Sequence, residues 1–378
     1  MSRRNPVYSP YRQAQINARR RVHALSIESL RRVDRSIETF ADDLTRVLGT
    51  LPEGESARQS ALARALQIIQ TRVRVRLREL LQVAVSTGRQ TSFDAILGIQ
   101  TDATLAVARA TDIPNNLLGA VRVPKVTMAG AWESLGTGSA TWKTLLSRYS
   151  DGAVDDVQRV VTVAMTAGVS PDELAKRLRP YVRGAETLPE AMKGAEGLSD
   201  RDLAQLLNTP ATAQSAKTLR HNAARIAFSE VHNARGEAEV QAFAADPFVN
   251  AVRWTLSPNR GTQTEPDVCD ALADSDFYGL GKGVYPVTKV PVSPHPWDRC
   301  ERVPVTRPLS EVDRPKPDPD RVLPFAEAKV RGSDTMIAQD RERIIRQVGN
   351  VFVTTAGSGS PLKLDALANQ AAVAGMVQ

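Results

Sequence analysis

The hydrophobic positions in the first part of the chain recur every three or four residues, which is the spacing of one face of an α-helix. This pattern predicts one helix over about 15–48 and a second over about 56–85, separated by the turn Leu51-Pro-Glu-Gly54. The apolar residues of the first alternate in threes and fours, as at a helix–helix seam: Ile27, Leu30, Val33, Ile37, Phe40, Leu44 and Val47. Those of the second are Leu62, Leu66, Ile69, Val73, Leu77, Leu80 and Ala84. We therefore expect an antiparallel helical hairpin over residues 1–90, with residues 1–13 as an extended arm.

The next stretch, residues 91–212, is predicted to be a helical middle region with a weaker pattern. Helices are expected over about 101–111 and 151–167. The sequence Ser170-Pro-Asp-Glu173 has the form of a capping box with a proline in the first turn. A short helix should therefore begin there and end near Leu178, before Pro180.

A long helix is predicted over about 213–245, with an alanine-rich buried face on which Glu230 lies and needs a partner. Beyond this helix the pattern changes to an alternation with a period of two, which predicts strands at 249–256, 284–290 and 302–305. We expect residues 213–306 to form a β-rich module packed on the long helix, followed by a Pro-rich linker and a C-terminal tail over 307–378. The predicted fold class is α+β and predominantly helical.

The loops of the β-rich module contain both cysteines of the chain, Cys269 and Cys300, together with His295. Zinc prefers thiolate and imidazole ligands, so these three residues form a candidate metal site. The fourth ligand would be water or one of the nearby carboxylates Asp267, Asp270 and Asp298. The spacing lacks a Cys-x-x-Cys pair, and two other interpretations stay open: a disulfide bond, or two buried thiols.

Five motifs follow one another along this part of the chain: Ala-Arg-Ile-Ala-Phe-Ser-Glu-Val (224–231), Val-Arg-Trp-Thr-Leu (252–256), Asp-Val-Cys-Asp-Ala-Leu (267–272), Tyr-Gly-Leu-Gly (278–281) and His-Pro-Trp-Asp-Arg-Cys (295–300). Their order resembles that of the phage Mu F-like minor head protein family, also called the phage head morphogenesis domain. The resemblance covers roughly residues 130–306. Asp298 stands where the family pattern has the first cysteine of its second element, and no second cysteine follows Cys269.

The resemblance implies a structural protein rather than an enzyme. It implies a minor capsid protein of a tailed phage or prophage, present in several copies per virion, inside the head near the portal, and made in the host bacterial cytoplasm. The implied partners are the portal protein and the major capsid or scaffolding protein, with a role in head assembly or DNA delivery. The alternative is a metal-dependent hydrolase or nuclease that uses Cys269, His295 and Cys300. Glu230, Trp254 and Asp267 are expected to have structural roles.

Charge adds a candidate contact surface. The net charge is +7, and residues 1–90 contain 17 Arg, no Lys and 8 acidic residues, so this part alone carries +9. Arginine favours bidentate contacts with phosphate or carboxylate, which makes viral DNA or an acidic protein surface a candidate partner; a solvated helix face explains the charge equally well. No apolar run is long enough to span a membrane. The candidate contact residues are Arg19, Arg20, Arg21, Arg72, Arg74, Arg76 and Arg78.

Overall fold

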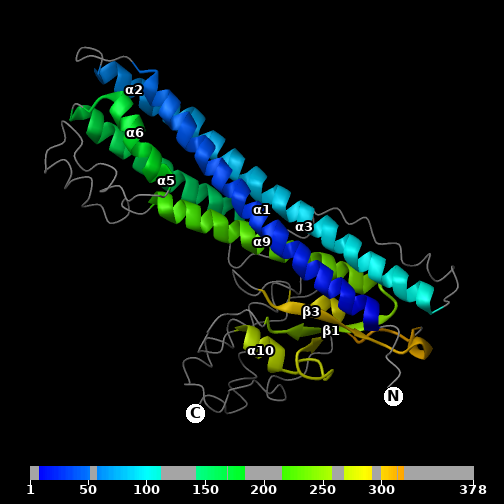
Figure 1. The fold of residues 1–378 in the computed structure, drawn as a ribbon. Coiled ribbons are helices and arrows are strands. Elements are labelled where there is room, and N and C mark those ends of the chain that lie inside the picture. Colours follow the sequence, from blue (N-terminus) through cyan, green and yellow to red (C-terminus); the bar gives the residue numbers. More distant parts are fainter. Residues whose placement is uncertain are drawn as a thin grey trace, which may run out of the picture. The chain divides into compact units, whose positions relative to one another are not determined.

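The fold, given by a computed structural model, is predominantly helical with one small antiparallel sheet, which confirms the predicted class (Figure 1). The structure describes residues 8–51, 58–111, 142–167, 169–183, 215–257, 268–291, 299–312 and 314–318. The helices are α1 (Tyr8–Gly49), α2 (Arg58–Ile68), a π-helical turn (Ile69–Val73), α3 (Arg74–Ala110), α5 (Trp142–Thr166), α6 (Pro171–Val182), α9 (Ser215–Ala245) and α10 (Val268–Asp274). The strands are β1 (Val249–Thr255), β2 (Val284–Tyr285) and β3 (Glu301–Thr306).

The chain divides into two compact units, each built from separate stretches. Unit 1 comprises residues 1–25, 89–139 and 231–378, and unit 2 comprises residues 26–88 and 140–230. Three long helices, α1, α3 and α9, contribute residues to both units. The sequence predicts a division into four consecutive regions, 1–90, 91–212, 213–306 and 307–378. That division follows chain order, unlike the two units, and it remains a prediction.

In unit 2 the buried face of the second helical stretch repeats every four residues. A strict four-residue spacing drifts by about 40° per step around an α-helix. The π-helical turn at Ile69–Val73 holds one extra residue and absorbs part of that drift. The predicted register was therefore wrong in part: Leu62, Leu66 and Leu80 are only partly buried. Of the predicted residues, Ile69, Val73, Leu77 and Ala84 are buried, as expected. The buried residues are Ala61, Ala65, Ile69, Val73, Leu77, Leu81, Ala84 and Val85.

Several helix ends differ from the predictions. The helix expected from residue 15 begins at Tyr8, so residues 8–13 are helical and not an extended arm. The second helical stretch continues to Ala110, because the apolar spacing does not stop at residue 85. The Ser170 cap is confirmed by a hydrogen bond from the Glu173 amide to Ser170 Oγ, at 3.3 Å. The helix that it opens runs through Pro180 to Val182, since a proline in the last turn removes only one backbone bond.

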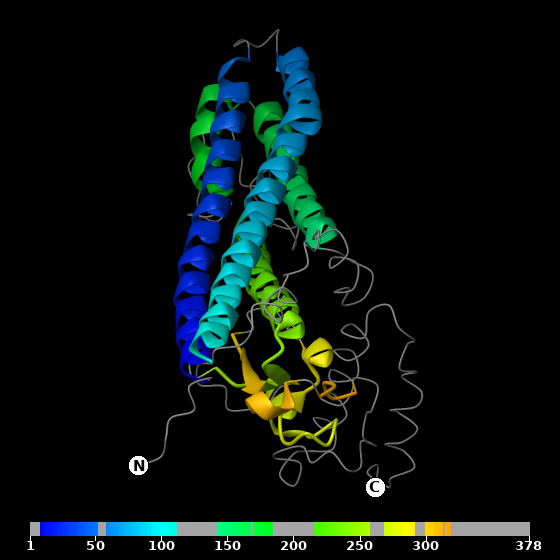
Figure 2. The same cartoon turned by 90° about the vertical axis from the view of Figure 1, so that its right-hand side faces the viewer.

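Unit 1 contains the sheet, whose strand order is β2-β1-β3 with both pairs antiparallel. Helix α10 packs against β1 (Figures 1 and 2). The strand predicted over 284–290 is shorter than expected: it ends at Tyr285, because Pro286 lacks a donor and starts a 3-10 turn at Val287–Lys289. The second half of α9 packs its small residues against α1 and α3, as its alanine-rich face predicted. The core cluster there contains Ala18, Val22, Leu25, Phe93, Ile96, Val231, Ala234 and Ala238.

The linker predicted to begin at residue 307 instead starts as part of unit 1. Arg307 donates from Nε to the carbonyl of Pro247 at 2.8 Å, and its backbone amide donates to Phe248 O at 3.0 Å. Lys316 Nζ donates to the carbonyls of Phe243, Ala244 and Asp246 at 2.8, 2.9 and 2.9 Å. These bonds satisfy carbonyl groups at and just past the end of α9, which a helix terminus leaves without internal partners. The helices and strand predicted between residues 325 and 376 lie outside the described residues.

Candidate functional site

The centre of unit 1 contains a cluster of charged side chains, here called the Glu239 cluster: Gln15, Arg235, Glu239, Trp254 and Arg302. Glu239 is 0% exposed and accepts hydrogen bonds from two guanidinium groups. Arg235 Nε donates to Oε1 at 2.8 Å, and Arg302 Nε donates to Oε2 at 2.9 Å. A buried carboxylate needs this kind of pairing, because removal of a charge from water is otherwise strongly unfavourable.

The same cluster joins elements that are far apart in sequence. Gln15, on α1, donates from Nε2 to the backbone carbonyl of Arg302 at 3.1 Å. The guanidinium of Arg302 lies 5.7 Å from the centre of the Trp254 ring, within the range of a cation–π contact. Trp254 is on β1 and 1% exposed. The Glu239 cluster therefore ties α1, α9, β1 and β3 together through polar contacts.

His232 lies one turn before Arg235 on α9, and its environment disfavours a charged imidazole. Burial lowers the pKa of His232, and together with the nearby charges of Arg235, Arg302, Arg299 and His23 it brings that pKa to about 3. At neutral pH its imidazole is therefore uncharged.

A second buried ion pair joins α3 to α9. Arg89 is 0% exposed and binds both carboxylate oxygens of Glu237, at 2.7 and 2.5 Å. Burial raises the pKa of Glu237, and the guanidinium of Arg89 opposes that change. A single guanidinium nitrogen, Nη2, donates to both oxygens, and these charge-assisted hydrogen bonds favour the ionised pair.

A third buried carboxylate, Asp246, follows the last turn of α9. It accepts hydrogen bonds from Tyr11 Oη at 2.5 Å, from Thr104 Oγ1 at 2.6 Å and from the Phe248 amide at 2.8 Å. Burial raises the pKa of Asp246, and these three bonds oppose the rise. Burial also lowers the pKa of Lys316 to about 8, although the nearby carboxylate of Asp246 favours its charged form.

The structure places the two predicted thiol ligands in one core. Cys269, on α10, is 0% exposed and Cys300, just before β3, is 3% exposed. Both belong to the hydrophobic cluster around β1, and they form no disulfide bond. His295 and Asp267 lie outside the described residues, so the three-ligand metal site stays a prediction. Within the described ranges no group of three or more His, Cys, Asp or Glu side chains is placed to hold a metal ion.

The glycine-rich loop at 279–283 is closed by a carboxylate of the chain itself. Asp276 accepts from the amides of Leu280 and Gly281 at 3.0 and 3.1 Å. Gly283 has φ +66°, and a Cβ there would lie 2.6 Å from the carbonyl oxygen of Ala273. The glycines thus permit a tight turn beside β1. Glycine-rich loops can bind phosphate through their backbone amides, but here the amides of Leu280 and Gly281 are already bonded to Asp276.

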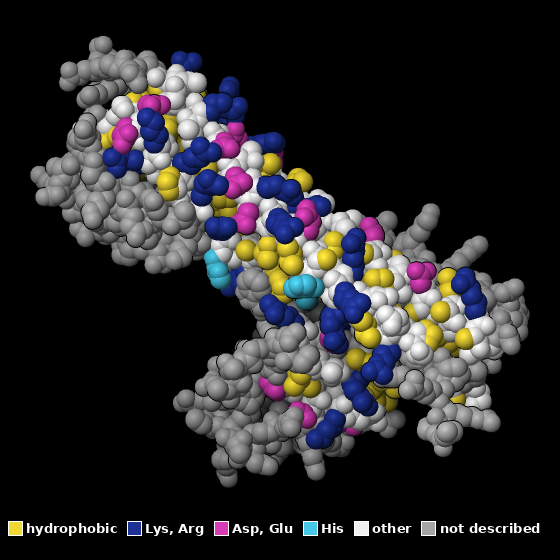
Figure 3. Space-filling model, in the orientation of Figure 1, with side chains coloured by type: hydrophobic (Ala, Val, Ile, Leu, Met, Phe, Trp, Pro, Cys, Tyr) yellow, Lys and Arg dark blue, Asp and Glu magenta, His cyan; other side chains and the backbone are white. Residues whose placement is uncertain are grey.

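The predicted arginine contacts fall into two groups. Arg20, Arg21, Arg72 and Arg76 are exposed. Arg19 is 54% exposed in its side chain but pairs with Glu301 at 2.5 Å. On the face shown in Figure 3, Lys and Arg side chains gather around the sheet and the N-terminal part of α1 in unit 1.

Arg74 and Arg78 are occupied within unit 2. Arg74 pairs with Asp155 of α5, and Arg78 pairs with Asp151 of the same helix. Residues four apart share one face of a helix. Accordingly, Arg72 and Arg76 are exposed to solvent, whereas Arg74 and Arg78 contact α5. Of the residues expected to be structural, Glu230 is 8% exposed and Trp254 is buried in the Glu239 cluster.

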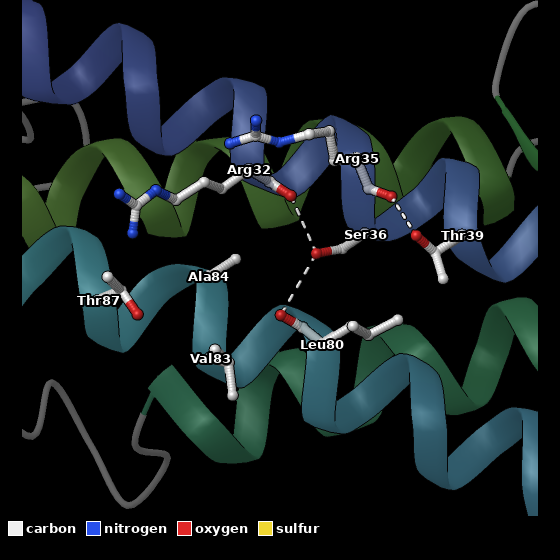
Figure 4. A pocket seen from close by; sticks show the side chains of 8 residues that line it. All are labelled: Arg32, Arg35, Ser36, Thr39, Leu80, Val83, Ala84 and Thr87. Carbon is white, nitrogen blue, oxygen red and sulfur yellow. Dashed lines mark hydrogen bonds between the residues drawn. The ribbon is translucent and has the colours of Figure 1, made fainter.

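A shallow hollow lies between α1 and α3 in unit 2, here called the α1–α3 groove. Its volume is ≈ 220 Å³. Figure 4 shows Ser36 between the two helices, where its hydroxyl donates to Arg32 O at 2.9 Å and to Leu80 O at 3.3 Å. The groove is lined by Arg32, Arg35, Ser36, Thr39, Leu80, Val83, Ala84 and Thr87.

Sequence reasoning missed the Glu239 cluster and Asp246. One signal was present: Arg235 and Glu239 are four residues apart and directly follow Ala234 and Ala238 of the buried face. Charged residues four apart beside such a face indicate a buried pair. Their partner Arg302 comes from a strand 63 residues after Glu239, which no local pattern identifies.

Comparison with known proteins gives no relative. No family model matches the chain, and no match is found among the curated proteins or the solved structures.

Proposed function

We propose that this chain is a minor capsid protein of a tailed phage or prophage, bound inside the head near the portal, where it assists head assembly or DNA delivery. The proposal rests on the resemblance to the Mu F-like minor head proteins. Its support from the geometry is that described residues of three later motifs of that resemblance lie together in unit 1. Trp254 on β1, Cys269 on α10 and Cys300 before β3 belong to one hydrophobic core.

The buried charges of unit 1 support a structural role. Arg235, Arg302 and Arg89 bind the carboxylates of Glu239 and Glu237, which fixes α9 to α3 and the sheet. Buried ion pairs of this kind make unit 1 rigid, so that its surface keeps one shape for partner proteins to bind. No membrane-spanning helix is found among the described helices.

The exposed arginines of α1 are the proposed contact with viral DNA. Arg20 and Arg21 carry charge at the surface of unit 1. Phosphate contacts of this kind release counterions, so binding weakens steeply as salt rises, with a slope of about −0.9 per phosphate neutralised.

The test of the role is co-assembly. The full chain is expressed with the portal, scaffolding and coat proteins of a phage or prophage from the same genome, and heads are analysed by quantitative mass spectrometry. We expect several copies per head, and loss of these copies when the portal is omitted. Heads that exclude the chain, or that retain it without the portal, would contradict the proposal.

The DNA contact is tested separately on the full chain. We expect a 30-base-pair duplex to bind at low salt, and the Arg20→Ala/Arg21→Ala double variant to reduce the salt slope by about 2. The control is Arg74→Ala/Arg78→Ala, because those side chains are held by α5. An unchanged slope in the first variant, or an equal loss in the control, would show that the arginines of α1 do not contact DNA.

A further inference from the structure

The α1–α3 groove combines an apolar floor with a basic rim. Val83 is 62% exposed, although a valine in a helix between packed partners is normally covered. Leu80 and Ala84 lie beside it on the same face of α3. Arg32 and Arg35 form the rim on α1, and none of the described residues that line the groove is acidic.

The charge of this rim is only partly neutralised. Arg32 Nε and Arg35 Nη2 both donate to one carboxylate oxygen, Glu28 Oε1, at 3.2 and 3.0 Å. Two guanidinium groups against one carboxylate leave a local charge of about +1. The side chain of Arg35 is 65% exposed, so it can reorient toward a ligand. Figure 4 shows both arginine side chains extending the same way along α1.

Two hydroxyl groups of the groove, those of Ser36 and Thr39, already donate to backbone carbonyls. Ser36 donates to two carbonyls, and Thr39 Oγ1 donates to Arg35 O at 2.9 Å. The ligand chemistry of the groove is therefore set by its apolar floor and its two cations.

We infer that the α1–α3 groove binds an amphipathic, acidic helix of a partner protein. Residues 32 and 35 are about 4.5 Å apart along α1, close to the 5.4 Å pitch that separates carboxylates one turn apart on a facing helix. An apolar side chain between two such carboxylates would cover Val83. A helix that lies in a groove between two others buries its apolar face in this way.

Charge argues against a second copy of unit 2 as the occupant. The acidic residues of α1 that lie four apart are already paired: Asp34 with Arg220, Glu38 with Arg183 and Asp42 with Arg179. The acidic residues Asp151 and Asp155 of α5 pair with Arg74 and Arg78. Each of these acidic residues would have to leave its own arginine before it could reach the groove of another copy. Nucleic acid is less suited, because a phosphate backbone gains nothing from the exposed valine.

The inference goes beyond the proposed function and does not depend on it. It is tested with the full chain and a synthetic, fluorescein-labelled 18-residue helical peptide that carries leucine on one face and glutamate on both flanks. Fluorescence anisotropy gives Kd. We expect saturable binding, weakened at least tenfold by Val83→Asp and by Arg35→Glu.

Matched controls exist on α3 and on α2, outside the groove. Val75, on α3, is 45% exposed and does not line the groove, so Val75→Asp should leave Kd within twofold. Arg64 on α2 is exposed, and Arg64→Glu makes the same charge change as Arg35→Glu outside the groove. A peptide with lysine in place of glutamate should bind Arg35→Glu better than it binds the wild type. Circular dichroism of each variant shows whether the helices persist.

Four results would overturn the inference. The first is that the acidic peptide does not bind, and the second is that a scrambled peptide of the same composition binds equally well. The third is that Val75→Asp or Arg64→Glu weakens peptide binding as much as Val83→Asp or Arg35→Glu does. The fourth is a wild-type dimer in sedimentation that Val83→Asp converts to a monomer without any effect on the peptide. Displacement of the peptide by duplex DNA whose own binding needs Arg35 and Val83 would assign the groove to nucleic acid instead.

Discussion

Arg302 of β3 and Glu239 of α9 form a fully buried ion pair, with 2.9 Å between Nε and Oε2. Each side chain is at most 2% exposed, and the same carboxylate binds Arg235 through its other oxygen. The pair fixes the last strand of the sheet to the long helix. The contact is strong only while all three charges are present, because each one left alone would be buried without compensation.

Loss of this pair should destabilise unit 1 strongly. For Arg302→Met we expect the free energy of unfolding to fall by about 3–5 kcal/mol, since Glu239 loses one of its two cations. Urea unfolding followed by circular dichroism measures it. Arg46→Met is the control, because the side chain of Arg46 is 74% exposed and its pair with Asp43 should be worth at most about 0.5 kcal/mol. Equal losses of unfolding free energy in the two variants would mean that the buried pair stabilises the protein no more than the exposed pair does.

Gly283 should tolerate no side chain. An alanine Cβ would lie 2.6 Å from Ala273 O and 3.1 Å from Trp254 O, at a φ of +66°. We expect Gly283→Ala to lower the free energy of unfolding by about 2 kcal/mol or more. Gly152→Ala is the matched control: it lies within α5 with nothing within 4 Å of the added Cβ, so it should stabilise the protein by about 0.5–1 kcal/mol. The two melting temperatures should therefore move in opposite directions.

Acid should destabilise the protein partly through His232. Its pKa is lowered from 6.5 to about 3 in the folded state, so the unfolded chain binds a proton that the folded chain does not. Stability from this group is complete above pH 6.5 and is lost as the pH falls toward 3. In His232→Gln, the slope of unfolding free energy against pH between 6.5 and 4 should become shallower than in the wild type. An unchanged slope would show that the imidazole is already solvated in the folded state.

The ion pairs between α1 and the arginines of α6 and α9 should matter little. In the pair of Asp42 with Arg179, the side chains are 60% and 49% exposed, and exposed pairs of this kind contribute about 0–1 kcal/mol. We expect Asp42→Asn to change the free energy of unfolding by less than about 0.5 kcal/mol, and 1 M NaCl to remove even that difference. A loss of several kcal/mol would show that these pairs act as a cooperative network.

The two thiols should be protected in the folded protein. Cys269 and Cys300 are buried in the same apolar core, so a thiol reagent should label them only after unfolding. Labelling rates measured with and without denaturant test this. Elemental analysis of the same sample decides the zinc prediction: one equivalent of zinc, lost in His295→Ala, would support the predicted site.

The sequence predicted the parts of this fold that depend on local pattern. The Ser170 cap and the three strand positions follow from spacing and residue type, and most of their bounds agree with the structure. The register of α2 and α3 was predicted only in part: Ile69, Val73, Leu77 and Ala84 are buried as expected, but Leu62, Leu66 and Leu80 are not. The buried face repeats every four residues through a π-helical turn at residues 69–73, and the spacing of threes and fours in the sequence does not indicate that turn. The partners Tyr11 and Asp246 are 235 residues apart, so only the folded chain brings them together.

The discontinuous make-up of the two units has a consequence for synthesis. Unit 2 needs residues up to 230, and the core of unit 1 also needs the sheet that ends at Thr306. The apolar faces of α1 and α3 therefore leave the ribosome long before α9 and the sheet exist to cover them. During that interval the nascent chain exposes hydrophobic surface, which makes chaperone binding or early pairing of α1 with α3 a requirement for a good yield of folded protein.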